Sequence, residues 1–114
     1  MGYKMFLDDV RSVDMVYPGE VESFVVVRSF AAFVRHIQKY GLPEFISFDN
    51  DLGEDEHGSL LPDGYACAKW MVYEQAYDLK TIAFRVHSAN PVARVQIESL
   101  LSNYIRFLNE ESKP

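Results

Sequence analysis

Four short apolar segments, each stopping abruptly at a polar or charged residue, constrain the fold of this 114-residue chain more than any other feature. They are Lys4–Leu7, Phe24–Arg28, Phe45–Phe48 and Thr81–Val86. They are rich in Phe, Val and Ile and do not alternate between apolar and polar residues, which is typical of strands buried on both faces of a parallel sheet. The sequence therefore predicts an α/β fold with a four-stranded parallel sheet.

Three helices are predicted from apolar residues that recur at helical spacing within residues 30–37, 66–77 and 97–108. Ser29 precedes the first helix and Asp63 the second, and both residue types commonly cap a helix N-terminus. A Gly-Leu-Pro sequence follows the first helix as a stop signal. Strands that alternate with helices in this way favour right-handed crossovers between parallel strands.

The chain length and the order of elements predict one domain over residues 1–108, followed by a polar tail at residues 109–114. The first connection, Val10 to Ser23, carries a Tyr-Pro-Gly sequence and no convincing apolar stripe. We therefore expect an irregular crossover there, with at most a short helix.

The charge of the chain limits its partners. Its formal net charge is −6, and eight of its 17 acidic residues belong to one region, namely Asp8, Asp9, Asp49, Asp51, Glu54, Asp55, Glu56 and Asp63. An acidic protein repels a polyanion, so we expect no extended nucleic-acid surface, whereas one phosphate accompanied by a metal ion can bind. No segment reaches the length of a membrane span, and the single Cys67 cannot form an internal disulfide, so we expect a cytoplasmic protein without a membrane partner.

Polar residues follow every predicted strand, and the carboxyl ends of parallel strands meet at one edge of a sheet. These residues are Asp8-Asp9, Arg28-Ser29, Asp49-Asn50-Asp51 and His87-Ser88-Ala89-Asn90. Two unit charges about 4 Å apart repel by roughly 4 kcal/mol at an effective dielectric near 20, so the aspartates need a bound cation or a raised pKa. Mg²⁺ suits a site of oxygen ligands, whereas Zn²⁺ would find few nitrogen ligands and no thiolate there.

Other interpretations of these residues exist. Asp8 and Asp9 could simply cap the following turn, and His87 could be a hydrogen-bonded histidine of the core. A calcium loop beginning at Asp49 is excluded, because Glu54 stands where that loop needs glycine and Leu60 where it needs glutamate. The acidic run from Glu54 onward is more typical of a solvated loop than of metal ligands.

Three short motifs resemble a known family. Leu-Asp-Asp-Val-Arg at 7–11, Phe-Asp-Asn-Asp-Leu-Gly at 48–53 and His-Ser-Ala-Asn-Pro at 87–91 are similar to the receiver domains of two-component response regulators, and closer to the cyclic-phosphate processing receiver-like domains. The resemblance implies a flavodoxin-like three-layer sandwich with strand order 2-1-3-4. A typical receiver has a fifth strand that ends in a phosphate-pairing lysine, and we expect this shorter chain to have neither.

The resemblance also implies roles for individual residues. Asp9, Asp49 and the carbonyl of Asp51 would bind Mg²⁺, with Mn²⁺ as a possible substitute, and Asp8 would act through water. Asp49 occupies the position that accepts phosphate in receivers. Ser88 would contact the phosphate.

Our leading hypothesis is a metal-dependent phosphoesterase that acts on a cyclic phosphate of a nucleotide or an RNA end. Arg11, Ser88 and Asn90 would bind the phosphate, Asp8 would orient water, and His87 would protonate the leaving alkoxide. Whether Asp49 is a covalent nucleophile or a metal ligand alone is left open. The alternatives are a truncated receiver that accepts phosphate on Asp49 and a signalling or interaction module without catalysis.

Overall fold

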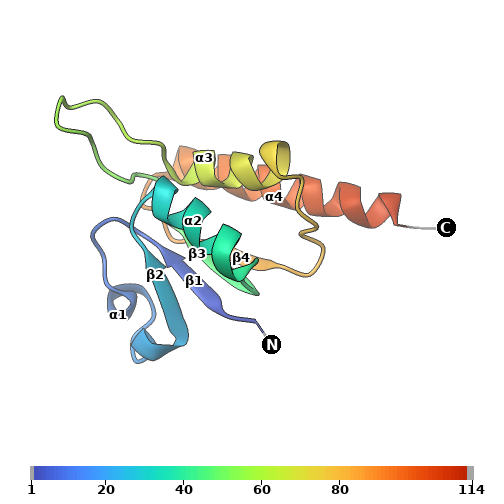
Figure 1. Ribbon diagram of the computed structural model, residues 1–114, viewed down its shortest axis with the longest axis horizontal. Helices are drawn as coiled ribbons and strands as arrows, with labels where there is room; N and C mark the ends of the chain where they lie inside the picture. Colours follow the sequence, from blue (N-terminus) through green and yellow to red (C-terminus); the bar gives the residue numbers. More distant parts are fainter. Residues whose placement is uncertain (1, 113–114) are drawn as a thin grey trace.

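A computed structural model describes residues 2–112. Within them four parallel strands form one sheet in the order β2-β1-β3-β4 (Figure 1). The strands are β1 (Lys4–Leu7), β2 (Phe24–Val27), β3 (Phe45–Phe48) and β4 (Ala83–Val86). This confirms the predicted strand order. The first connection contains only the short helix α1 (Val13–Val16) and the 3₁₀ turn η1 (Val21–Ser23), in agreement with the irregular crossover expected there.

The register of the sheet brings the ends of three strands level. Phe48 of β3 lies opposite Leu7 of β1 and Val86 of β4. The ladder continues by one hydrogen bond on each side, because Asp49 N donates to Leu7 O and His87 N donates to Phe48 O, both at 2.8 Å. The residues that follow the three strands therefore emerge side by side at one edge.

Two strands are shorter than the sequence suggested. β2 ends at Val27 and not at Arg28, and β4 begins at Ala83 and not at Thr81. The chain is still turning before β4, because Ile82 N donates to Leu79 O. Ladder pairing starts only where Ala83 N donates to Glu44 O.

The capping residues act as their types predict. Ser29 Oγ accepts from Ala32 N at the start of α2 (Phe30–Tyr40), which ends at Gly41 with a φ of 86°. Asp63 accepts from Ala66 N at the start of α3 (Gly64–Lys69). These side chains satisfy backbone donors that have no partner within the helix.

The predicted end of the second helix, at Tyr77, is wrong. α3 passes into a π-helical segment, η2 (Trp70–Glu74), and helical structure stops there, before Tyr77. The backbone widens, since Gln75 N donates to Trp70 O, and Ala76 then takes a positive φ of 47°. Tyr77 instead packs edge-on against Trp70.

The last helix, α4, runs from Pro91 to Glu111, with Asn90 as its N-cap. It extends beyond the apolar stripe at residues 97–108 and includes the first residues of the predicted polar tail. Residues 113–114 of that tail lie outside the described residues. None of the helices within residues 2–112 combines the length and the apolar composition that a membrane span requires.

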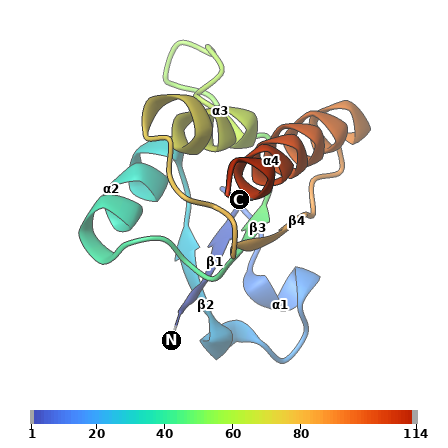
Figure 2. The ribbon, with the colours of Figure 1, turned by 90° about the vertical axis from the view of Figure 1, so that its right-hand side faces the viewer.

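The two faces of the sheet are covered unequally (Figure 2). α2, α3 and α4 lie over one face and enclose the main core, which includes Met5, Leu7, Ile46, Phe48, Ile97 and Leu101. Cys67 is fully buried in this core, and burial raises the pKa of its thiol, so it is an unreactive packing residue. On the other face α1 lies beside an aromatic cluster of Phe6, Tyr17, Phe24 and Phe45.

The close approach of α3 to the edge of the sheet yields a first prediction. A Cβ at Gly64 would overlap the backbone carbonyl of Asp49, so Gly64→Ala should lower the free energy of unfolding by more than about 2 kcal/mol. Gly58→Ala is the control, because that site has a φ of +78° but open space around it. Urea unfolding of both variants measures the difference. Because the cost at Gly58 comes from its positive φ alone, a Gly64→Ala variant that loses no more stability than Gly58→Ala would contradict a severe overlap with Asp49.

Candidate functional site

A pocket of about 520 Å³ lies at the carboxyl edge of the sheet. Six of the residues singled out from the sequence line it: Asp9, Arg11, Asp49, Asp51, Ser88 and Asn90. Asp8 and His87 are not among its lining residues and lie beneath it. The topology therefore gathers the predicted residues but divides them into a pocket wall and a buried support.

Asp8 is the centre of the buried support and has no exposed surface. Its Oδ1 accepts from the backbone N–H groups of Val10 and Arg11, and its Oδ2 accepts from Arg11 Nη1 and His87 Nε2 at 3.1 and 3.0 Å. Burial by itself raises the pKa of this carboxyl, but the four hydrogen bonds together outweigh it and lower the pKa below its usual value. Asp8 is therefore a fixed negative charge.

At Asp49 the effects that raise the pKa outweigh those that lower it, the reverse of Asp8. Asp49 is 6% exposed, and its Oδ1 accepts from Asn50 N at 2.8 Å. Burial, followed by the negative charge of Asp8, raises the pKa of Asp49 to about 6. The side chain thus occupies a place where a second negative charge is unfavourable unless a cation is near.

Arg11 is the cation that the two carboxylates share. Its Nη1 lies 3.1 Å from Asp8 Oδ2 and 3.7 Å from Asp49 Oδ1. The loop that carries Arg11 is held in turn by Arg28, whose Nη1 donates to the carbonyls of Asp8 and Arg11. Sequence reasoning placed Arg28 at this edge but gave it no role. A basic residue directly after a strand, facing an acidic pair, was the available signal.

His87 does not line the pocket, and its side chain is 3% exposed. Burial lowers the pKa of the imidazole, more than the neighbouring Asp8 raises it, so the ring is neutral at pH 7. Because the Asp8 carboxylate can only accept, the single N–H lies on Nε2 and is donated to it. The ring also stacks on Phe6, with the two planes 1° apart and the centroids separated by 4.7 Å.

The other ring nitrogen of His87, Nδ1, begins a hydrogen-bond chain through two residues that were not predicted from the sequence. Ser47 Oγ lies 2.7 Å from His87 Nδ1, and the Tyr17 hydroxyl lies 2.8 Å from Ser47 Oγ. A neutral Nδ1 accepts the Ser47 proton, so Tyr17 is the donor to Ser47. Ser47 is fully buried and is the one polar residue of β3, which was the signal in the sequence.

Ser88 and Asn90 border the pocket at the start of α4. Ser88 is buried, and its Oγ accepts from Asn90 N at 3.1 Å, so its own hydroxyl proton can be donated elsewhere. Asn90 Oδ1 accepts from Val92 N and Ala93 N as the helix cap. Its side-chain carbonyl is thus engaged, and only its amide N–H groups can serve a ligand.

The arrangement offers two overlapping sets of metal ligands. One oxygen each of Asp8 and Asp49 and one nitrogen of His87 lie within 4.8 Å of one another. Asp9, Asp49 and Asp51, the set predicted from the sequence, all line the pocket. The second set consists of oxygen atoms alone and faces a cavity, which is the environment that Mg²⁺ prefers.

Comparison with known proteins identifies the family. The sequence model of the cyclic-phosphate processing receiver domain matches residues 3–103. The chain belongs to this family. No curated protein matches this receiver domain. A solved structure described as a yeast Spc42 trimeric coiled coil, amino acids 181–211, fused to another structure is similar to it, with a TM-score of 0.57, 15% sequence identity and coverage of 99% of this chain and 83% of that chain. That likeness shows a shared fold alone.

The pKa of Asp49 predicts a stability change in this receiver domain. Because its folded pKa of about 6 exceeds its ordinary value of 3.8, ionised Asp49 destabilises the metal-free fold as pH rises through that window. Asp49→Asn should therefore raise the free energy of unfolding at pH 7 by about 2 kcal/mol, with the gain vanishing below about pH 4. Urea unfolding in the presence of a chelator measures this. Asp55→Asn, the same change at an exposed site, should have no such effect, and a less stable Asp49→Asn at pH 7 would contradict the prediction.

The buried chain from Tyr17 to Asp8 predicts a graded loss of stability. Ser47→Ala leaves His87 Nδ1 without a donor and should lower the free energy of unfolding by about 1 to 3 kcal/mol. Tyr17→Phe removes only the outer hydrogen bond and should lower it by about 1 kcal/mol. Denaturant titration compares the two variants. A Ser47→Ala variant as stable as the parent would show that this chain does not hold His87.

Proposed function

We propose that this cyclic-phosphate processing receiver domain is a metal-dependent phosphoesterase that opens a cyclic phosphate of a nucleotide or an RNA end. The observation that carries the proposal is the pair of buried carboxylates, Asp8 and Asp49, that share the Arg11 guanidinium at the floor of an open pocket. Such a site attracts a cation and an anion together, as the hydrolysis of a phosphate ester requires. We expect this domain to act in the cytoplasm.

The residues present fit a divalent cation. Asp9, Asp49 and Asp51 would hold Mg²⁺, or Mn²⁺. The pKa of Asp49 is raised by burial and then by the charge of Asp8, and a nearby cation would favour its ionised form. When bound, the ion would polarise the phosphoryl group and help a water molecule to attack.

The protein groups then divide the remaining tasks. Arg11 and Ser88 bind the non-bridging phosphate oxygens, since both line the pocket and both can donate hydrogen bonds. Water adds its oxygen to phosphorus, one ring P–O bond breaks, and a proton from water ends on the released hydroxyl. Asp8 holds Arg11 in the orientation that this binding needs.

His87 receives a different role from the one expected from the sequence. Its Nε2–H is donated to Asp8 and its side chain is buried, so we assign it the positioning of Asp8 and not direct protonation of the substrate. The Ser47 hydroxyl supports this role by occupying the second ring nitrogen.

A second function is favoured by the position of Asp49. Its carboxylate follows β3 and lines the pocket beside Arg11 and Ser88, so it could accept a phosphoryl group directly. In that case the domain is a phosphorylation switch, and the bond formed is an acyl phosphate on Asp49. A module that binds phosphate without turnover is the third outcome to be distinguished.

Turnover assays test the leading proposal. We expect hydrolysis of 2′,3′-cyclic or 3′,5′-cyclic nucleotides with Mg²⁺ or Mn²⁺, abolished by a chelator and reduced by about 100-fold or more in Asp49→Asn and Arg11→Ala. Asp55→Asn is the matched control and should keep parental activity, because Asp55 lies outside the pocket wall. Equal turnover in Asp49→Asn and the parent would overturn the proposal. A stable mass increase of one phosphoryl group after incubation with a small phosphodonor and Mg²⁺, absent in Asp49→Asn, would favour the switch.

A further inference from the structure

The pocket has an apolar side that a phosphate group does not need. Val10, Leu60 and Leu61 line the same cavity as Asp49 and Ser88. Val10 is 76% exposed and Leu60 is 81% exposed. Single exposed aliphatic residues are ordinary, but three around the mouth of one polar pocket form a surface that can hold an apolar group next to a phosphate.

The leucines belong to an ordered loop, residues 53–63, that projects past the carboxyl edge of the sheet (Figure 1). Leu61 N donates to Gly53 O at 3.0 Å, and Glu54 and Leu60 form an antiparallel bridge. At the far end Asp55 Oδ1 accepts from the backbone of His57 and Ser59. The loop is therefore a closed hairpin whose base fixes the two leucines at the pocket.

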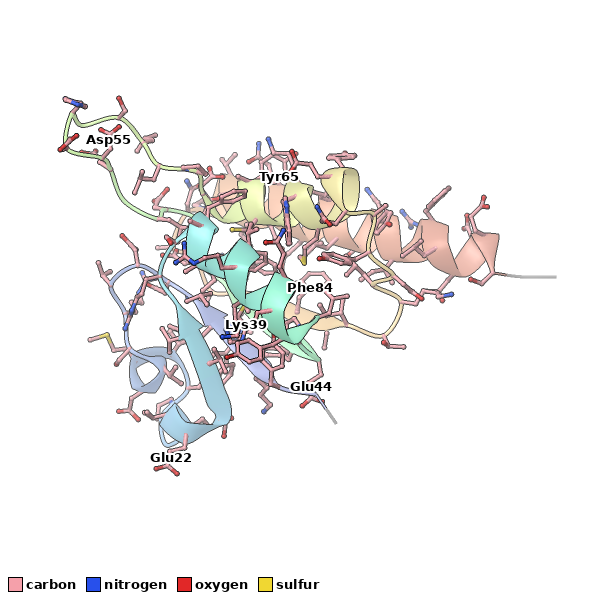
Figure 3. All side chains as sticks on the ribbon, viewed as in Figure 1. Glu22, Lys39, Glu44, Asp55, Tyr65 and Phe84 are labelled. Carbon is pink, nitrogen blue, oxygen red and sulfur yellow. The ribbon has the colours of Figure 1, made fainter. Side chains whose placement is uncertain are left out.

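The same loop carries negative charge. Glu54, Asp55 and Glu56 are exposed on it, and Asp55 lies at its outer end (Figure 3). Glu54 also lines the pocket. The phosphates of a polynucleotide that left the pocket over this loop would be repelled by all three acids, whereas a ligand with a single phosphate beside Arg11 and Ser88 would not meet Asp55 and Glu56, which lie outside the pocket wall.

The pocket also lacks the groups that bind single strands. Among the described residues that line it none is aromatic, and Arg11 is the one basic side chain. Proteins that hold single-stranded nucleic acid combine aromatic stacking platforms with a basic groove along the backbone. The volume of about 520 Å³ exceeds the needs of a phosphate and lies in the range of small-molecule sites.

On the basis of the proposed function, we infer that the substrate is a free nucleoside cyclic phosphate whose base packs against Val10, Leu60 and Leu61, and that the end of an RNA strand is excluded. The phosphate lies toward Arg11 and Ser88, and the base lies between the two loops that bear the aliphatic residues. Specificity for the nucleoside then resides in these side chains and not in the metal ligands.

Three substrates separate the parts of this inference: a nucleoside 2′,3′-cyclic phosphate, glycerol 1,2-cyclic phosphate, which has no base, and an oligonucleotide that ends in a 2′,3′-cyclic phosphate. We expect kcat/KM to be at least about tenfold higher for the nucleoside than for the other two. Leu60→Ser should raise KM for the nucleoside about fivefold and leave the glycerol ester unchanged. Met15→Ser, a change at a residue with 72% exposure outside the pocket, is the control.

Charge is tested separately. The double variant Asp55→Asn and Glu56→Gln, at two exposed residues outside the pocket wall, should increase kcat/KM severalfold for the oligonucleotide and leave the glycerol ester unchanged. Equal kcat/KM for the nucleoside and the glycerol ester, a preference for the oligonucleotide, or a Leu60→Ser loss that is the same on every substrate would each overturn the inference.

Binding distinguishes failure of the inference from failure of the proposed function. With Mg²⁺ present, calorimetry should show a nucleoside 3′-monophosphate bound at least about tenfold more tightly than inorganic phosphate, and this advantage should fall in Leu60→Ser. If this holds but no cyclic phosphate is hydrolysed, the proposed chemistry fails and the ligand class stands. Equal affinity for nucleotide and phosphate overturns the ligand class whatever the turnover, and no binding of either overturns both.

Discussion

Two carboxylates buried side by side at the end of a parallel sheet are the constraint around which the rest of this edge is arranged. The register that sets Phe48 opposite Leu7 leaves no freedom in where Asp8 and Asp49 emerge. Their repulsion is handled unequally, because Asp8 receives four hydrogen bonds and stays ionised, whereas Asp49 receives fewer and has a pKa raised to about 6. The electrostatic cost of holding two carboxylates together therefore falls mainly on Asp49, the residue that lines the pocket.

The buried support beneath the pocket explains why a polar chain crosses an otherwise aromatic face. Tyr17, Ser47, His87 and Asp8 form consecutive hydrogen bonds, so each polar atom next to Phe6 has a partner. Among the described residues no buried side-chain nitrogen or oxygen lacks one. A satisfied network of this kind fixes the rotamer and the tautomer of His87.

The features that could be predicted from the sequence are those that depend on short-range patterns of residues. Unbroken apolar runs predicted the strands, and Ser29 and Asp63 predicted helix starts, because these signals act within a few residues. The gathering of the polar residues at one edge followed from the parallel arrangement of the strands alone. The direction in which a side chain points did not, so His87 was expected in the pocket although its ring is buried and hydrogen-bonds to Ser47. The π-helical end of α3 and the role of Arg28 likewise depend on tertiary contacts that no local pattern contains.

The buried support and the pocket wall differ in how readily their residues can be substituted, and this difference affects how ligand specificity can change. Asp8 and His87 are tied to the sheet by its register and by hydrogen bonds, so replacing either one leaves a buried polar group without a partner. Leu60 is 81% exposed where it lines the pocket, and its loop is held by the backbone contacts of the hairpin. Substitutions there alter the shape of the cavity with little loss of stability, since they disturb no buried partner. If the proposed function holds, the sheet would keep the metal-binding and phosphate-binding residues rigid, while a loop that can vary would select the group attached to the phosphate.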